Sequence, residues 1–293
     1  MHVPRSIPRM ISLLLPLGLG FIMFALGLGL GLDDFRSALR KPRALLLGLL
    51  AQIVLLPLTA FLLAKALRLS PEAAVGLMVL AACPGGVTAG MITHLARGET
   101  ALSISLSALT SLLAVVTVPV VVGLALTVFM GESSTVRAPT GQLAGGLVLV
   151  TLLPVGLGLW LKETERVTLR TRQLVQRLAT GIFALIVLHT FFVQWPAISA
   201  EFPVLAPACL ALNLITMGTG FILGAVARVS TRGRIALTVE CGMQNSALGI
   251  TLALSLLAEP AFAVPSVVYA LLMNVTALAL IAWRSFQPAR STA

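Results

Sequence analysis

Residues 73–96 have the sequence AAVGLMVLAACPGGVTAGMITHLA, an apolar stretch with Pro84, Gly85 and Gly86 near its middle. About 20 apolar residues are enough to cross a bilayer as a helix. Proline lacks a backbone hydrogen-bond donor and glycine is a poor helix former, so these three residues should interrupt the helix. Non-helical backbone at membrane depth is tolerated only against protein or a water-filled cavity. The stretch therefore predicts a broken membrane helix beside a cavity.

A second apolar stretch, residues 235–258, contains the polar segment Glu240-Cys241-Gly242-Met243-Gln244-Asn245-Ser246. Counted along the chain, the two interrupted stretches are the third and eighth predicted membrane helices, so they run in opposite directions. Each is followed by one more helix before its half of the chain ends. This order is typical of an inverted repeat, in which the broken helices of the two halves form the binding site.

The composition of the whole chain also indicates a membrane protein. Of its 293 residues, 58% are hydrophobic and 10% are charged, and the mean hydropathy is +1.03. Soluble domains have roughly 25% charged residues. We expect an all-α, polytopic membrane protein that forms a single unit over residues 1–293. Nine transmembrane helices are predicted at about 9–31, 44–66, 73–96, 101–130, 142–161, 174–195, 203–227, 235–258 and 263–283.

The basic residues indicate how these helices are oriented. A net charge of +10 would suggest nucleic-acid binding in a soluble protein, but here the basic residues lie at the ends of apolar stretches, so no nucleic acid is expected. Fifteen of the twenty Lys and Arg residues fall on one side of the membrane. The other five are Arg5, Arg9, Lys65, Arg68 and Arg137. Because basic loops mark the cytoplasm, we expect the N-terminus outside and the C-terminus inside, in a bacterial inner membrane.

Glu240 is an acidic residue inside an apolar stretch, and such a residue is expected to be functional. Its burial should require a partner, a proton or a bound cation. A hard cation such as Na⁺ prefers oxygen ligands, and these could come from the side chains of Gln52, Glu240 and Gln244 and the freed carbonyls of Cys241 and Met243. The alternatives are a protonated Glu240 that only packs between helices, and a Gln52 that only forms an interhelical hydrogen bond.

The two breaks also predict a site for an anion. After each break a new half-helix begins, and its unpaired N–H groups carry the positive end of the helix dipole. Two such ends that face one cavity would favour a carboxylate. The candidate ligands are the backbone after Gly86 and the side chain of Thr88 on one side, with Asn245 and Ser246 on the other.

The chain resembles the bile acid:sodium symporter family in four segments: Cys83-Pro84-Gly85-Gly86, Leu95-Ala96-Arg97-Gly98, Ala101-Leu102-Ser103 and residues 240–246. The resemblance implies two crossed, broken helices in a core domain, and a panel domain that rocks against it while Na⁺ drives uptake of an organic anion. It places the core at about 44–130 and 203–283, and the panel at about 9–31, 142–161 and 174–195.

The same resemblance implies the positions of the sodium sites. One site would use Gln52, Glu240, Cys241, Met243 and Gln244, and all of its side-chain ligands are present. A second site would use Ser103, Ser107 and Glu240 together with a Ser-Asn pair. In this chain Ala89 and Gly90 replace that pair, so the number of coupled Na⁺ ions stays open.

The sequence predicts a Na⁺-driven transporter of a bile-acid-like or carboxylate substrate, and three other functions are alternatives to it. A transporter of the same fold could be coupled to protons through Glu240, or could be uncoupled. An intramembrane enzyme or sensor is less well supported, because the sequence has no His-Glu-x-x-His and no Gly-x-Ser-x-Gly motif. No obligate protein partner is expected, and the sequence does not identify the substrate.

Overall fold

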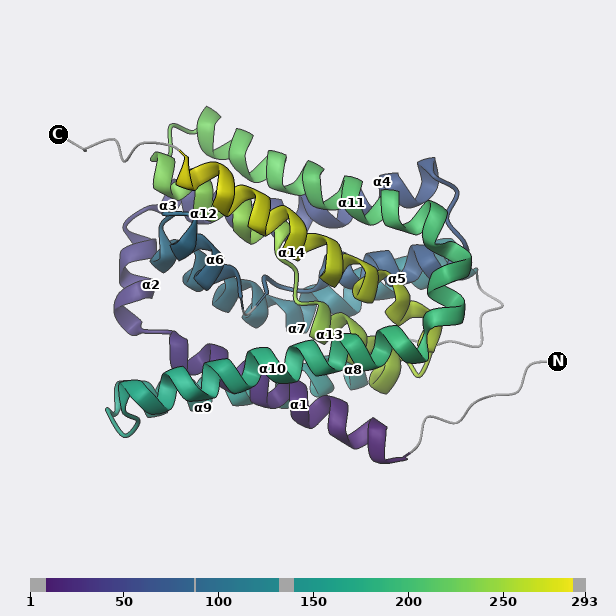
Figure 1. The fold of residues 1–293 in the computed structure, drawn as a ribbon, viewed down its shortest axis with the longest axis horizontal. Helices are drawn as coiled ribbons and strands as arrows, with labels where there is room; N and C mark the ends of the chain where they lie inside the picture. The colour runs from purple at the N-terminus through teal and green to yellow at the C-terminus, as the bar shows by residue number, and fades with distance from the viewer. Residues whose placement is uncertain (1–8, 87, 132–139, 287–293) are drawn as a thin grey trace.

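The structure is a computed structural model that describes residues 9–86, 88–131 and 140–286. Most of these residues form helices that run along the long axis of the molecule (Figure 1). The predicted all-α membrane fold is confirmed. The first half contains α1 (Arg9–Gly29), α2 (Leu32–Leu39), α3 (Pro42–Leu50), the π-helix η1 (Ala51–Leu55), α4 (Leu56–Ala66), α5 (Pro71–Ala82), α6 (Ala89–Leu95) and α7 (Thr100–Met130). The second half contains α8 (Thr140–Leu147), the π-helix η2 (Val148–Leu152), α9 (Leu153–Glu163), α10 (Leu169–Val193), α11 (Trp195–Val226), α12 (Thr231–Gly242), α13 (Ser246–Thr251), the π-helix η3 (Leu252–Leu256), the 3₁₀ turn η4 (Pro260–Ala263) and α14 (Val264–Ser285).

Six helices in the described part of the chain are long and apolar enough to cross a membrane. The bent pair Leu14–Gly29 and Leu32–Leu39, which meets at 69°, would make a seventh. The remaining two predicted spans are divided into shorter helices, α5 with α6 and α12 with α13 and η3. The count of nine transmembrane helices therefore stays a prediction.

Several predicted boundaries differ from the structure by a few residues, and two of these differences have a clear cause. The first helix was expected to end near residue 31, but it ends at Gly29 and turns into α2, whose polar sequence LDDFRSAL suits a surface position. The seventh helix was expected to begin near residue 203, but α11 begins at Trp195. Pro196 occupies the first turn of α11, where its missing N–H costs nothing, so the helix starts earlier than hydropathy alone suggested.

The helices pack in two sets of neighbours. α1 packs against α9 and α10, and these helices lie along the lower edge of Figure 1. Gly27 and Gly158 allow this close approach, because a Cβ on Gly27 would overlap Val155 O and one on Gly158 would lie 2.7 Å from Leu28 N. α11 packs against α12 and α14, and α5 packs against α7. Large apolar side chains on the outer surface, such as Val116 at 66% exposure, suit contact with lipid.

Contacts between distant connections gather at one end of the molecule, on the left of Figure 1. Lys41 Nζ lies 2.5 Å from Glu99 Oε1, and Glu99 N donates to Arg232 O at 2.9 Å. Lys162 Nζ lies 3.9 Å from Asp34 Oδ2. These contacts join the connections that follow the first, third, fifth and seventh predicted helices, which are the connections rich in Lys and Arg. Arg5 and Arg137, which the sequence assigned to the opposite side, lie outside the described residues.

Candidate functional site

The two breaks meet each other in the middle of the molecule. α5 ends at Ala82 and α6 begins at Ala89, while α12 ends at Gly242 and α13 begins at Ser246. Gly85 and Gln244 form an antiparallel bridge, with Gly86 N donating to Met243 O at 2.6 Å and Asn245 N donating to Pro84 O at 2.9 Å. Each break therefore supplies hydrogen-bond partners for backbone groups that the other break releases from its helix.

Glu240 lies in the last turn of α12 and is fully buried. Its carboxylate accepts hydrogen bonds from two serines of α7: Ser103 Oγ donates to Oε2 at 2.8 Å, and Ser107 Oγ donates to Oε1 at 2.5 Å. Gly85 lies directly against Oε1, and a Cβ at this position would overlap it. Within the described ranges no salt bridge involves Glu240. The carboxylate therefore belongs to a compact group made by α7, α12 and the first break.

Gln52 and Gln244 form a second polar group beside the first. The π-helix η1 carries Gln52, whose Nε2 donates to Glu240 O at 2.6 Å. Gln244 Nε2 donates to Gln52 Oε1 at 3.2 Å and to Cys241 O at 3.0 Å. Pro57, which follows η1, has no N–H to continue the regular helical pattern, and π-bulges of this kind are frequent at functional sites.

The predicted sodium ligands are thus brought together in two adjoining groups rather than in one. Gln52 and Gln244 contact the backbone of α12, whereas the Glu240 carboxylate points to Ser103 and Ser107. The carbonyl of Met243 already accepts Gly86 N. The buried Oε1 of Gln244 has no hydrogen-bond partner in the described structure. An unpaired buried acceptor is costly, so this oxygen fits a role as a cation ligand.

Asn213 and Tyr269 also contact the second break, although neither was predicted from the sequence. Asn213 Nδ2 and Tyr269 OH donate to Gly242 O at 2.8 and 2.9 Å, and Asn213 Nδ2 also lies 3.2 Å from Tyr269 OH. Two donors therefore hold the last carbonyl of α12 at the start of the second break. The available signal was polarity within apolar stretches: Asn213 lies in α11, and Tyr269 is the one tyrosine of the chain.

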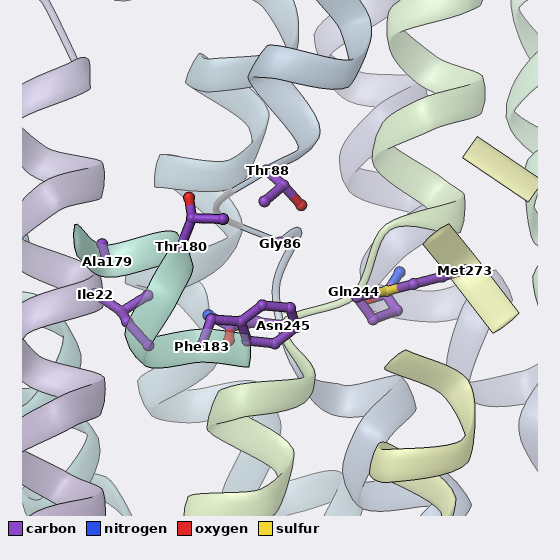
Figure 2. Close-up of a pocket in the computed structure, with 9 residues that line it drawn as sticks. All are labelled: Ile22, Gly86, Thr88, Ala179, Thr180, Phe183, Gln244, Asn245 and Met273. Carbon is purple, nitrogen blue, oxygen red and sulfur yellow. The ribbon is translucent and has the colours of Figure 1, made fainter. Parts of the chain in front are cut away.

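A cavity lies in front of the crossing (Figure 2). Its wall is formed by Ile22 of α1, by Ala179, Thr180 and Phe183 of α10, by Met273 of α14, and by Gly86, Thr88, Gln244 and Asn245 from the two breaks. A larger space continues from Thr88 and Thr180 to His94 and Gln176 and contains about 860 Å³, including its open mouth. The two spaces share Thr88 and Thr180. Together they reach from the crossing toward the end of the molecule where the connections rich in Lys and Arg lie.

Only three of the four predicted anion ligands lie at the cavity. Gly86, Thr88 and Asn245 line the cavity, but the fully buried Ser246 does not. The N–H of Gly86 itself donates to Met243 O, and residue 87, where the predicted backbone donors after Gly86 begin, lies outside the described residues. Asn245 Oδ1 accepts from Leu248 N at 3.0 Å, and Nδ2 lies 3.8 Å from Met23 Sδ of α1. Among the described side chains of the two breaks, the donors that line the cavity are the Thr88 hydroxyl and the amides of Gln244 and Asn245, and of these Gln244 Nε2 already donates to Gln52 and Cys241.

The three residues implied for the second sodium site, Ser103, Ser107 and Glu240, are also close together. The Ser-Asn pair of the family is replaced by Ala89 and Gly90, which supply no side-chain oxygen. Ala89 is buried at the start of α6. A Cβ on Gly90 would lie 2.8 Å from Ile104 Cγ1, so a larger residue at this position requires Ile104 to move.

Proteins with similar sequences are named as transporters. The sequence model of the sodium bile acid symporter family matches residues 16–201. The chain is 32% identical over 277 residues to a Bacillus subtilis protein named as an uncharacterised sodium-dependent transporter, YocS, covering 91% of this chain and 81% of the relative. It is 30% identical over 273 residues to an Arabidopsis thaliana chloroplast protein named as a probable sodium/metabolite cotransporter, covering 92% of this chain and 67% of the relative. The ileal sodium/bile acid cotransporter of Cricetulus griseus is 24% identical over 241 residues, which cover 82% of this chain and 69% of the relative.

The family match covers more than half of the chain, and the crossed breaks and the buried Glu240 lie in the segments Cys83–Gly86 and 240–246 that carry the resemblance. Members of this family move solutes across membranes, and the chain is a transporter rather than an enzyme. The chain belongs to the sodium bile acid symporter family.

Proposed function

We propose that the chain is a secondary active transporter that uses Na⁺ to carry a small organic anion, bile-acid-like or a simple carboxylate, by alternating access. The observation that carries this proposal is the crossing of two broken helices, with the buried Glu240 on one side and a cavity on the other. The names of the relatives support it, because they include sodium-dependent transporters and a sodium/bile acid cotransporter.

The oxygen atoms around the crossing support Na⁺ as the coupling ion. Gln52, Gln244 and the carbonyl of Cys241 lie within one hydrogen-bonded group, which contacts the backbone carbonyl of Glu240. A carboxylate with no basic partner among the described residues would gain from a nearby cation, and Na⁺ would replace the present hydrogen bond between the two glutamines. Ser103 and Ser107 would supply oxygens on the other side of the same carboxylate.

The cavity supports an amphipathic anion as the substrate. Ile22, Phe183 and Met273 form apolar walls, while Thr88 and the Asn245 amide supply donors at the two breaks. Among the residues that line the two connected spaces there is no Asp or Glu, so nothing in the wall repels a negative charge. A substrate with an apolar body and one carboxylate would fit this distribution.

The division into panel and core gives alternating access a structural basis. The proposed panel is α1, the continuous helix from α8 to α9, and α10, and the core contains the remaining spans. The cavity lies between these sets, with Ile22 and Phe183 on the panel and Thr88 and Asn245 on the core. Movement of one set against the other would close this opening and expose the site at the other end.

The proposed orientation places the basic end in the cytoplasm, so the described cavity would open inward. Cys83, Cys209 and Cys241 are buried, which favours labelling of an introduced cysteine. Leu169→Cys, at the exposed first residue of α10, should be protected from a membrane-impermeant thiol reagent in intact cells, whereas Leu67→Cys at the opposite end should react. Reaction of Leu169→Cys from outside would reverse the orientation.

Substitutions of Asn245 test whether its amide binds the anion. Asn245→Asp keeps the oxygen that caps Leu248 N but replaces the amide donor by a negative oxygen. We expect the apparent substrate affinity to fall roughly 10-fold to 100-fold, the effect of losing a hydrogen bond to a charged group. Asn245→Ser, which preserves a capping oxygen but lacks the amide, should show a similar loss.

Concentration dependence of uptake measures this effect, and the thermal stability of each variant shows whether the cap is intact. Unchanged substrate affinity in Asn245→Asp would contradict the assignment. If Asn245→Ala kept substrate affinity but lost its response to Na⁺, the roles of the two predicted sites would be reversed.

The proposed function is tested by uptake into proteoliposomes. A radiolabelled bile acid and short radiolabelled carboxylates should accumulate under an inward Na⁺ gradient, and should not accumulate when choline replaces Na⁺. Accumulation that follows an imposed pH gradient instead would identify the proton-coupled alternative. Equilibration that ignores both gradients would identify an uncoupled transporter, and no movement of any organic anion would overturn the proposal.

A further inference from the structure

A second concave site lies away from the substrate cavity, at the basic end of the molecule. It is formed by the turn between α2 and α3 and the turn between α11 and α12. Its basic residues are Arg40, Lys41, Arg43 and Arg228. α3 packs against both α11 and α12, so the two turns are held together by the helices that follow and precede them.

Of the four basic residues in this site, only Lys41 has an acidic partner among the described residues. Lys41 pairs with Glu99 at 2.5 Å. No ion pair involves Arg40, Arg43 or Arg228 in the part of the chain that the structure describes. No acidic residue is among those that line the site. Three guanidinium groups that share one concavity repel one another and favour a bound anion, and arginine binds phosphate in a bidentate geometry.

The position of the site indicates where that anion comes from. The apolar membrane-length helix Pro42–Ala66 begins at the site, and the helix Trp195–Val226 ends at it. Leu46 and Leu50 follow Arg43 along one face of α3 and are 64% and 44% exposed. Ile222 and Val226 lie in the last turns of α11, shortly before Arg228, and are 59% and 78% exposed. The basic site therefore sits where the lipid-facing apolar surface ends, which is the level of phospholipid headgroups.

We propose that Arg40, Arg43 and Arg228 bind the phosphate of an anionic phospholipid, whose acyl chains lie along the exposed apolar faces of α3 and α11. Basic pockets between membrane helices at the cytoplasmic surface bind anionic headgroups in this way. The lipid would join the span that carries Gln52 to the turn that leads into α12 and Glu240. This inference does not depend on the identity of the transported anion or of the coupling ion.

The test compares two double variants of the full chain that lose the same charge at the same end of the molecule. Arg43→Gln with Arg228→Gln removes two cations from the site. Arg170→Gln with Arg177→Gln removes two exposed cations from the start of α10, outside the site. Each protein is reconstituted in mixed phosphatidylglycerol and phosphatidylcholine, extracted gently, and analysed by native mass spectrometry for retained lipid.

The wild-type protein and the Arg170 and Arg177 variant should retain phosphatidylglycerol in preference to phosphatidylcholine. The Arg43 and Arg228 variant should bind it roughly 25-fold more weakly, because each cation near an anionic lipid contributes about a fivefold effect. Equal loss in both variants would show a general surface charge effect and would overturn the site. Retention of phosphatidylglycerol by the Arg43 and Arg228 variant would also overturn it.

A soluble probe separates the two sources of phosphate. Glycerol 3-phosphate carries the charged group without acyl chains, and it should raise the melting temperature of the delipidated protein far less than phosphatidylglycerol does. An equal rise with the soluble probe would assign the pocket to a soluble phosphate and overturn the lipid proposal. Circular dichroism of both double variants checks that they fold, which is expected because all four substituted side chains are exposed.

Discussion

Gly85→Ala should abolish most transport while leaving the protein folded in the membrane. The added Cβ would overlap Oε1 of Glu240 and would lie 2.9 Å from Ser107 Oγ. Because Glu240 is fully buried, its carboxylate must move within a packed interior, away from Ser103 and Ser107. Losing two hydrogen bonds to a charged group costs at least about 3 kcal/mol, which corresponds to a loss of roughly 100-fold in the population of the functional arrangement.

Gly123→Ala is the matched control for this substitution. Gly123 lies in α7, the helix that carries Ser103 and Ser107, and a Cβ at this position meets no atom within 4 Å. Initial rates of uptake in proteoliposomes should therefore be unchanged in Gly123→Ala and strongly reduced in Gly85→Ala, with both proteins eluting as single species in detergent. Normal uptake by Gly85→Ala would show that the close contact between the first break and Glu240 is not required for transport.

The contrast between the two glycines of the first break adds to this argument. Gly85 faces Glu240, whereas a Cβ on Gly86 would lie 3.1 Å from Gln244 O, a tight contact with backbone. A leucine at residue 86 would also extend into the cavity that Gly86 lines. Gly86→Leu should therefore block the substrate cavity, whereas Gly85→Ala should disturb the ion site. Gly85→Ala should therefore lose the response to Na⁺, whereas Gly86→Leu should lose substrate binding and also press on the backbone of Gln244.

The helix breaks were predictable from the sequence because their cause is local. Pro84 and the glycines that follow it cannot continue α5, and the structure ends that helix at Ala82. An acid in an apolar stretch was equally visible, and Glu240 is fully buried. Such features depend on the chemistry of a few neighbouring residues, so one sequence is enough to find them.

The contacts between the breaks were not predictable from residue chemistry, because they join segments far apart in the chain. Nothing near Gly85 indicates that it pairs with Gln244, and the serines that contact Glu240 were implied only through the family resemblance. Asn213 and Tyr269 belong to the site only because α11 and α14 pack beside α12. The 69° turn into α2 depends on where the bundle ends, which hydropathy does not report.

Glu240→Gln should remove the dependence of uptake on Na⁺. Glutamine keeps the size of the side chain, but it removes the negative charge to which Ser103 and Ser107 donate. Because both predicted sodium sites include Glu240, the loss should affect every coupled ion. We expect stimulation by Na⁺ to disappear in proteoliposomes, with residual uptake at the level seen in choline. Wild-type protein that ignores Na⁺ but follows a pH gradient would instead make Glu240 a proton carrier.

The number of Na⁺ ions should be set by residues 89 and 90. The group around Gln52, Glu240 and Gln244 retains all of its side-chain oxygens, whereas Ala89 and Gly90 offer none beside Ser103 and Ser107. At most one Na⁺ should therefore bind strongly, and uptake should depend on Na⁺ with a Hill coefficient of about one.

Ala89→Ser with Gly90→Asn should raise that coefficient or the Na⁺ affinity, but a Cβ at residue 90 would lie 2.8 Å from Ile104 Cγ1. The restored pair is best tested together with Ile104→Ala, and Ile104→Ala alone is its control. A wild-type Hill coefficient of about two would show that a second ion binds without the missing oxygens, and the hypothesis of one strongly bound Na⁺ would then be wrong.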